Sequence, residues 1–134
     1  MTKNTTLHRT IFITFCMLMS IGVSAQIPKV LNKGLAEGKV EHIYAFLNEN
    51  VELTVLDYDD VCSNNQAKQV LENFFKKNKP TEYKVIHIGG EVPKFYVVGT
   101  MQVVGNQDYR VYFLMKEIES IPRIYQLRIE KQKP

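Results

Sequence analysis

The feature that most constrains how this sequence can fold is a long run of strand-forming residues in its C-terminal half. Short turns of polar residues or glycine divide the run into four segments, each rich in β-branched and aromatic residues. Long strands joined by short turns pair side by side in antiparallel order. The sequence therefore predicts an antiparallel meander. Its expected strands are residues 83–88, 95–104, 109–118 and 124–130.

The residues before this meander follow helical spacing instead. One apolar stripe begins after Gln26, and a second follows Gly38, which should end the first helix. A third stripe follows Ser63 or Asn64, and either residue can cap a helix N-terminus. The expected apolar positions of the three helices are Ile27, Val30, Leu31 and Leu35; Val40, Ile43, Tyr44 and Leu47; and Ala67, Val70, Leu71, Phe74 and Phe75.

One further strand is expected between the second and third helices. Residues 51–55 alternate apolar and polar side chains, and the acidic segment 57–60 is typical of a turn. Two helices, a strand, another helix and four more strands indicate an α+β fold. We expect the helices to pack on a strongly bent, mostly antiparallel sheet of five strands. The helix after residue 64 should lie across the concave side of that sheet.

The N-terminal residues have the three-part layout of a secretory signal peptide. Basic residues precede an uncharged apolar stretch at 11–23, and small residues then lead to Ala25. The stretch is shorter than the roughly 20 residues that a bilayer core needs. The sequence therefore predicts cleavage between Ala25 and Gln26, one domain at 26–134, and export to the periplasm or outer-envelope space. The alternative is a retained membrane anchor.

Loss of this leader would bring the chain close to neutrality. The sequence has 17 basic and 14 acidic side chains, a formal net charge of +3, and Lys3 and Arg9 would leave with the leader. Binding to nucleic acids needs clustered Lys and Arg to neutralise phosphates. The composition therefore disfavours a nucleic-acid partner.

Cys62 is the one cysteine outside the predicted leader. It has no second cysteine there with which to form an intramolecular disulfide. We expect its side chain to be buried as a small apolar group, and the alternative is a link between two chains.

Several segments resemble known families. The step from helix to strand at 46–53 resembles the opening of the nuclear-transport-factor-two-like, or SnoaL-like, cone fold, which is also described as cystatin-like. This resemblance implies a cone-shaped α+β domain. Further segments are similar to a family of small exported Bacteroidota proteins known as domain of unknown function 4783, and that similarity implies an exported location but no activity or catalytic residue. These segments are 51–57, 73–75, 89–90, 109–114 and 126–130.

A cone-shaped domain encloses a space between its sheet and its long helix, and small ligands bind in spaces of this kind. Aromatic side chains are candidates for lining it, because tyrosine joins an apolar body to a polar tip. The alternative is that the tyrosines occur here only because strands favour them. The expected ligand contacts are Tyr44, Phe74, Tyr96 and Tyr112.

A small isomerase- or hydratase-like enzyme is an alternative function. Such an enzyme would need a carboxylate or histidine base, and a donor aimed at the developing oxyanion. No motif singles out such a pair, so the sequence assigns no catalytic residue and no cofactor. The ionisable candidates are His42, Tyr44, Glu52, Asp57, His87, Tyr96 and Tyr112.

Two partial motifs do not predict a site. The acidic segment 57–60 resembles the start of a calcium loop, but Cys62 and Lys68 occupy the positions that need glycine and glutamate. Residues 102–105 resemble the hairpin of cystatin-type protease inhibitors, but their glycine comes one position early. The sequence therefore predicts neither a metal site nor protease inhibition.

The polar residues of the last strand indicate a contact surface. Gln126, Arg128 and Glu130 alternate with apolar residues, and they share a face with Arg110 and Tyr112. We expect a homodimer through this face, and the alternative is a solvated surface. The residues together favour a non-catalytic module that binds a small ligand or a partner protein. An accessory subunit of an envelope assembly is a further alternative.

Overall fold

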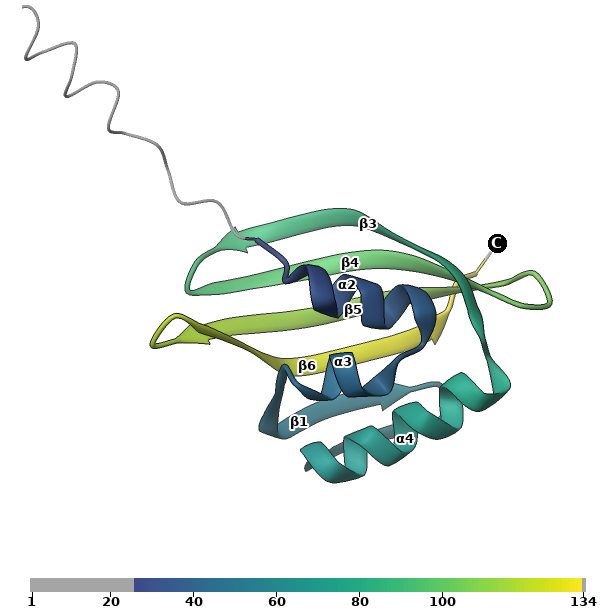
Figure 1. The fold of residues 1–134 in the computed structure, drawn as a ribbon, viewed down its shortest axis with the longest axis horizontal. Coiled ribbons are helices and arrows are strands. Elements are labelled where there is room, and N and C mark those ends of the chain that lie inside the picture. Colours follow the sequence, from purple (N-terminus) through teal and green to yellow (C-terminus); the bar gives the residue numbers. More distant parts are fainter. Residues whose placement is uncertain (1–25, 134) are drawn as a thin grey trace, which may run out of the picture.

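The computed structural model of the chain describes residues 26–133, and the predicted leader with Ala25 lies outside them. Two short helices come first, followed by a hairpin, a third helix and four consecutive strands (Figure 1). The elements are α2 Lys29–Glu37, α3 Val40–Tyr44, β1 Leu47–Val55, β2 Tyr58–Ser63, α4 Asn64–Lys77, β3 Pro80–Glu91, β4 Lys94–Val103, β5 Gln107–Ile118 and β6 Ile121–Lys131.

The strands form one curved, unclosed sheet in the order β2-β1-β6-β5-β4-β3. Neighbouring strands are antiparallel except β1 and β6, which run parallel, with Val55 beside Ile129. The predicted antiparallel meander is confirmed as β3 to β6. The parallel pair joins this meander to the N-terminal hairpin, so the sheet is mixed.

The predicted number of strands is wrong, because only Asp57 of the acidic segment 57–60 lies in the turn and the rest of the segment belongs to a strand. Asp59 and Asp60 belong to β2, where they pair with Thr54 and Leu53 of β1. The chain reverses just before them, at Leu56, whose φ of 55° lies in the left-handed region. The sheet within residues 26–133 therefore has six strands rather than five.

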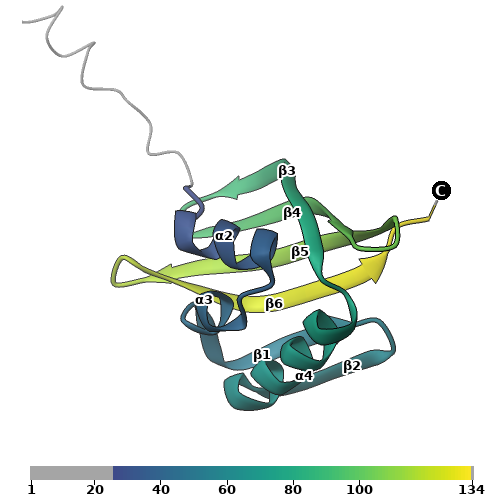
Figure 2. The ribbon, with the colours of Figure 1, turned by 45° about the vertical axis from the view of Figure 1, so that its right-hand side comes forward.

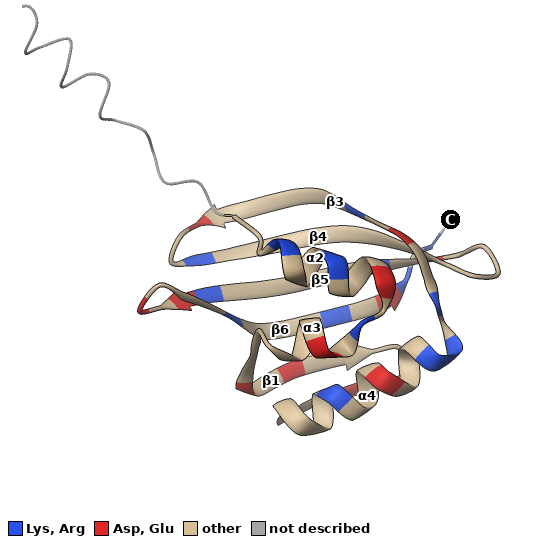
Figure 3. Cartoon of the chain, viewed as in Figure 1, with Lys and Arg blue, Asp and Glu red and all other residues tan. Residues whose placement is uncertain are grey.

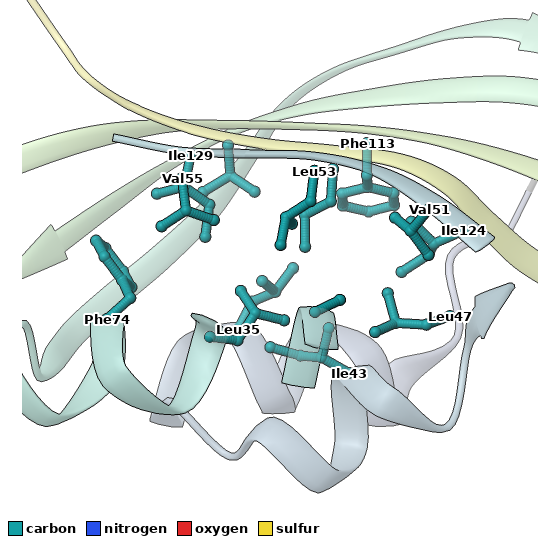
Figure 4. Packing of buried hydrophobic residues seen from close by; sticks show 14 of the residues in the cluster. Leu35, Ile43, Leu47, Val51, Leu53, Val55, Phe74, Phe113, Ile124 and Ile129 are labelled. Atoms are coloured by element: carbon teal, nitrogen blue, oxygen red, sulfur yellow. The ribbon is translucent and has the colours of Figure 1, made fainter. Parts of the chain in front are cut away.

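The helices cover one face of the sheet, which we call the inner face, and the opposite face is the outer face (Figure 2). Leu35 and Ile43 come from the helices, and they point toward Leu53 and Phe113 from the strands (Figure 4). All four side chains are buried. The predicted α+β class, with N-terminal helices packed on a bent sheet, is confirmed.

Helix α4 begins where the sequence predicts. The Ser63 Oγ accepts a hydrogen bond from the backbone N–H of Gln66 at 3.2 Å, and the Gln66 side chain accepts one from the N–H of Ser63 at 3.2 Å. This reciprocal capping box satisfies two backbone donors that the helix itself leaves free. Four of its five expected apolar positions are buried and Val70 is half-buried, which confirms the predicted core-facing stripe.

The first two helices are shorter than expected. Helix α3 ends at Tyr44, and Leu47 already belongs to β1, where it pairs with Ile124. Helix α2 turns Val30 toward solvent, with 50% of its surface exposed. The predicted stripe placed Val30 inside, but only Leu31, Gly34 and Leu35 of α2 are buried.

Two glycines let tyrosine rings lie flat across the β3–β4 pair, one on each face of the sheet. On the inner face, a Cβ added to Gly99 would come within 2.6 Å of the Tyr83 ring. On the outer face, a Cβ added to Gly89 would overlap the Tyr96 ring. An aromatic ring over a glycine of the neighbouring strand covers backbone that would otherwise be bare.

Candidate functional site

Apolar side chains fill the central part of the space between the helices and the sheet. Leu71 of α4, Phe95 of β4 and Phe113 of β5 are each at most 1% exposed. Within residues 26–133, no polar or charged residue is fully buried. The inner face therefore forms a hydrophobic core. The polar and charged side chains that could take part in binding or catalysis lie outside this core.

Two of the four expected ligand contacts lie on the inner side of the sheet. Phe74 is buried and packs edge to face against Phe75 and Tyr109, with ring centroids 5.1 and 5.2 Å away. Tyr44 joins α3 to α4, because its hydroxyl donates to Asn65 Oδ1 at 3.0 Å and the Lys68 Nζ lies 5.1 Å from its ring centroid. Phe74 is part of the core, and Tyr44 connects two helices.

The other two expected contacts lie together on the outer face. The ring centroids of Tyr96 and Tyr112 are 5.9 Å apart, with an angle of 31° between the ring planes. The Tyr96 hydroxyl is 3.4 Å from His87 Nε2 of the neighbouring strand. His87, Tyr96 and Tyr112 therefore form a short aromatic row over β3, β4 and β5. The structure brings this pair together and separates it from Tyr44 and Phe74.

The outer face is hollowed beside Tyr112. A depression of about 380 Å³ lies over β5 and β6, between Tyr112 and four polar or charged side chains. A second depression of about 490 Å³ adjoins it, shares Arg110 and Glu130, and has Ile86, Val98 and Thr100 on its other wall. The residues that line the first depression are Arg110, Tyr112, Gln126, Arg128 and Glu130.

The two arginines of this depression differ in their surroundings. Arg128 donates to the Glu130 carboxylate at 2.9 Å, and this hydrogen bond raises the pKa of the Arg128 guanidinium. Arg110 takes part in none of the ion pairs among residues 26–133. Strands β5 and β6 carry both basic and acidic residues, whereas the charged residues of β1 are all acidic (Figure 3). The depression thus offers one uncommitted guanidinium beside an aromatic ring.

The remaining catalytic candidates do not gather into one site. Glu52 and Asp57 are exposed on the hairpin of β1 and β2. His42 is half-buried in α3, with its Cβ against Gly34 of α2. A carboxylate and a proton donor that converge on one point would indicate acid–base chemistry. These residues instead belong to separate parts of the described chain.

A third depression was not predicted from the sequence. It has a volume of about 900 Å³ and lies between the start of α2 and the edge strand β3, with Ile27, Asn32, Val85 and Ile88 among its lining residues. Val85, Ile86 and Ile88 are exposed on β3 although they are apolar. The run of apolar residues gave a strand signal, but nothing in it showed that this strand would be an edge.

Cys62 is buried in β2, as predicted. No three His, Cys, Asp or Glu side chains of residues 26–133 are grouped so that they could hold a metal ion. None of the helices in the described part of the chain is long and apolar enough to cross a membrane.

Residues 28–130 match the family model described as "Domain of unknown function (DUF4783)". A solved DUF4783 family protein from Bacteroides ovatus is similar to this chain at 23% identity and a TM-score of 0.74, over 81% of this chain and 97% of that one. A second, from Bacteroides uniformis, is 21% identical with a TM-score of 0.74, over 81% and 100% of the two chains.

The fold is also similar beyond that family. A bacterial protein with a cystatin-like fold from Silicibacter pomeroyi is 18% identical with a TM-score of 0.56, over 77% of this chain and 71% of that one. None of the curated proteins compared with the chain matches it. The likeness to these solved structures shows the fold alone.

Proposed function

From the premise that the chain belongs to the DUF4783 family, we propose that it is an exported, non-catalytic module that binds a partner through the outer face of its sheet. The contact surface centres on the depression lined by Arg110, Tyr112 and Arg128. The module works in the periplasm or outer-envelope space after cleavage between Ala25 and Gln26. The family itself has no described activity.

One observation carries this proposal. The interior of the cone is filled by its own side chains, whereas the outer face holds a depression edged by aromatic, cationic and anionic groups. The buried core leaves a small ligand no room, because protein cores pack as densely as organic crystals. The third depression, between the start of α2 and β3, is open and is lined by exposed and half-buried side chains instead. A surface that mixes Tyr and Arg has the composition that protein contacts favour.

Site-specific photo-crosslinking in living cells tests the proposal. Tyr112 and Val30 are each replaced by the photo-reactive phenylalanine derivative p-benzoylphenylalanine, one on the outer face and one on exposed α2. The expected result is a crosslinked species with the probe at position 112 and none with the probe at position 30. Crosslinks from position 30 alone, or from neither, would contradict the outer-face assignment.

Export is tested separately on the protein recovered from its own cells. Intact-mass measurement should give the mass of a chain that begins at Gln26, and the protein should separate with the envelope fraction. A full-length mass in the cytoplasmic fraction would overturn the proposed location without affecting the surface assignment.

A further inference from the structure

Three basic residues lie side by side across the outer face, at the left-hand ends of β4, β5 and β6 in Figure 3. The register pairs Lys94 of β4 with Lys116 of β5, and Lys116 with Arg123 of β6, and we call these three residues the basic row. Residues that pair across neighbouring strands point to the same face, and like charges in such positions disfavour the sheet. None of the three takes part in an ion pair among residues 26–133.

Two of these cations are held in place by contacts within the chain. The Lys116 Nζ lies 4.4 Å from the centroid of the Tyr125 ring, and the Arg123 Nη1 donates to the backbone carbonyl of Ala45 at 3.2 Å. Neither contact neutralises the positive charge, and a guanidinium that donates one hydrogen bond keeps further N–H donors. A cation that is already held loses less side-chain entropy when an anion binds it. The basic row is therefore prepared for anionic groups.

The positive charge continues along the strands. Arg110 lies on the same face of β5 as Lys116, and the six residues from one to the other span about 20 Å of strand. Tyr112 and Leu114 lie between them and are half-buried. Basic residues outnumber acidic ones on the outward side of β4, β5 and β6, although the chain from Gln26 onward is close to neutral. The outward basic residues are Lys94, Arg110, Lys116, Arg123 and Arg128, and the acidic ones are Asp108 and Glu130.

We propose that the partner at the outer face is a protein that presents an extended acidic segment, whose carboxylates contact the basic row and Arg110. This inference rests on the proposed function, because it names the chemistry of the partner at the same surface. The length of the positive strip favours a polypeptide over a small ion, because a single phosphate or carboxylate group is far shorter than about 20 Å, whereas six or seven extended residues cover it. Tyr112 and Leu114 in the middle of the strip offer an apolar contact to the uncharged side chains of that segment.

Acidic residues on the two flanking strands limit where such a segment can lie. Glu91 of β3 is beside Lys94, but the two form none of the ion pairs in the described part of the chain. Glu52 of β1 is beside Gln126 of β6. These two carboxylates repel an acidic partner over β1 and β3, and the cations attract it over β4, β5 and β6. Electrostatic complementarity of this kind fixes the orientation of a partner, so we expect the segment to run along β5.

Charge reversal in the basic row tests the inference on the chain that begins at Gln26. The probe is a fluorescein-labelled peptide of alternating glutamate and threonine, because alternate side chains of an extended peptide share one side. Lys116→Glu should bind this peptide at least about tenfold more weakly than the unchanged chain does, because like charges then face each other. Fluorescence anisotropy measures the change. The unchanged chain should bind the peptide more weakly as the salt concentration rises, and it should not bind a peptide of alternating glutamine and threonine.

Two controls separate the surface from the fold. Lys33→Glu makes the same charge change on the exposed side of α2, and it should bind the acidic peptide as the unchanged chain does. Lys116→Glu places a carboxylate between Lys94 and Arg123, so that attraction replaces repulsion across the strands. This variant should therefore resist urea at least as well as the unchanged chain. Lys94→Glu, at an exposed position of the same row, provides a second reversal that should also weaken peptide binding.

An unchanged chain that does not bind the acidic peptide at millimolar concentration would overturn the inference, and so would a Lys116→Glu variant that binds it as well as Lys33→Glu does. Binding to vesicles of phosphatidylcholine and phosphatidylglycerol in place of the peptide would also overturn it, and would assign the basic row to an anionic lipid. In cells, Lys116→Glu should abolish the crosslink from position 112, and Lys33→Glu should not. A crosslink to a protein that persists in Lys116→Glu would support the proposed function and exclude only the acidic segment.

Discussion

The two faces of the sheet come from the same strands but differ in almost every physical respect. Along β5, Val111, Phe113 and Met115 point inward and are fully buried, whereas Arg110 and Tyr112 between them point outward. Because side chains alternate along a strand, neighbouring residues can serve separate purposes. The inner face stabilises the fold, and the outer face is available for recognition.

A tyrosine ring lies over a glycine on each face of the sheet, but the two rings differ in how far they can move. Tyr83 lies over Gly99 on the inner face, where it is half-buried against the core, and its hydroxyl oxygen is buried without a hydrogen-bond partner. Tyr96 lies over Gly89 on the half-exposed outer side, with His87 beside its hydroxyl. A ring packed against the core has less room to move away from a new methyl group than a ring on the outer face.

The largest expected effect comes from removing an inner aromatic ring. Phe113→Ala should lower the free energy of unfolding by about 3–5 kcal/mol, because it leaves a cavity in a closely packed core. Tyr112→Ala, one residue away on the outer face, should cost about 1 kcal/mol, within the range of strand preference. Urea denaturation at low micromolar concentration compares the two, and equal losses would refute the assigned difference between the faces.

A smaller effect is expected from filling the two glycine positions. Gly99→Ala should cost about 1–3 kcal/mol, because the new methyl group meets the Tyr83 ring, which packs against the core. Gly89→Ala should cost less, because Tyr96 can rotate into solvent. In a Tyr83→Ala background, Gly99→Ala should lose most of its own effect, and a double-mutant cycle measures that coupling. Additive losses would show that the ring is not the cause.

Removing the Tyr83 hydroxyl should stabilise the protein. The hydroxyl oxygen is buried and neither accepts nor donates a hydrogen bond. No hydrogen bond therefore compensates for the free energy that its removal from water costs. Tyr83→Phe should therefore raise the free energy of unfolding by about 1 kcal/mol, as measured by urea denaturation at pH 7. Tyr96→Phe on the outer face is the control and should change little. A destabilised Tyr83→Phe variant would indicate a partner for the hydroxyl.

The same residue makes stability depend on alkaline pH. Burial raises the pKa of Tyr83 well above its usual value, whereas the unfolded chain ionises near pH 10. Above about pH 10 the unfolded state loses a proton that the folded state keeps, so stability falls by up to about 1.4 kcal/mol per pH unit. Unfolding curves from pH 8 to 11 should show a steeper fall for the unchanged chain than for Tyr83→Phe. Parallel curves would contradict this assignment.

The smallest effect is expected for the ion pair of the outer face. Arg128→Gln should cost less than about 0.5 kcal/mol in dilute protein, because an exposed ion pair contributes little. At high protein concentration the loss should increase if two copies associate through this face, because association stabilises the folded state by mass action. Melting temperatures at two protein concentrations test this. A loss of stability that is the same at both protein concentrations would argue against a role for Arg128 in association.

Local signals were sufficient for much of the fold. The N-cap candidates Ser63 and Asn64, and the apolar stripe after them, place α4 without knowledge of the rest of the chain, and the structure shows that Ser63 is the cap. The four C-terminal strands follow from their residue types and short turns. Element ends were less predictable: Leu47 fits the stripe of α3, but its pairing with Ile124 draws it into β1.

The candidate site was predictable only in part. Alternation along 126–130 correctly grouped Gln126, Arg128 and Glu130 on one face, and Arg110 and Tyr112 lie beside them, as the sequence also predicts. The expected aromatic pocket combined residues from both faces, because residue type alone does not tell which side of a sheet a tyrosine occupies.

The sequence by itself determined the order of helices and strands, the capped start of α4 and the alternating pattern of the last strand, because these depend on neighbours a few residues apart. Only the tertiary structure decided that β1 joins β6 in parallel, that 58–63 is a sixth strand, and that Tyr96 and Tyr112 meet on the face away from the helices. Strand pairing depends on residues far apart in the chain, and the free energy of burying one face selects among the possible pairings.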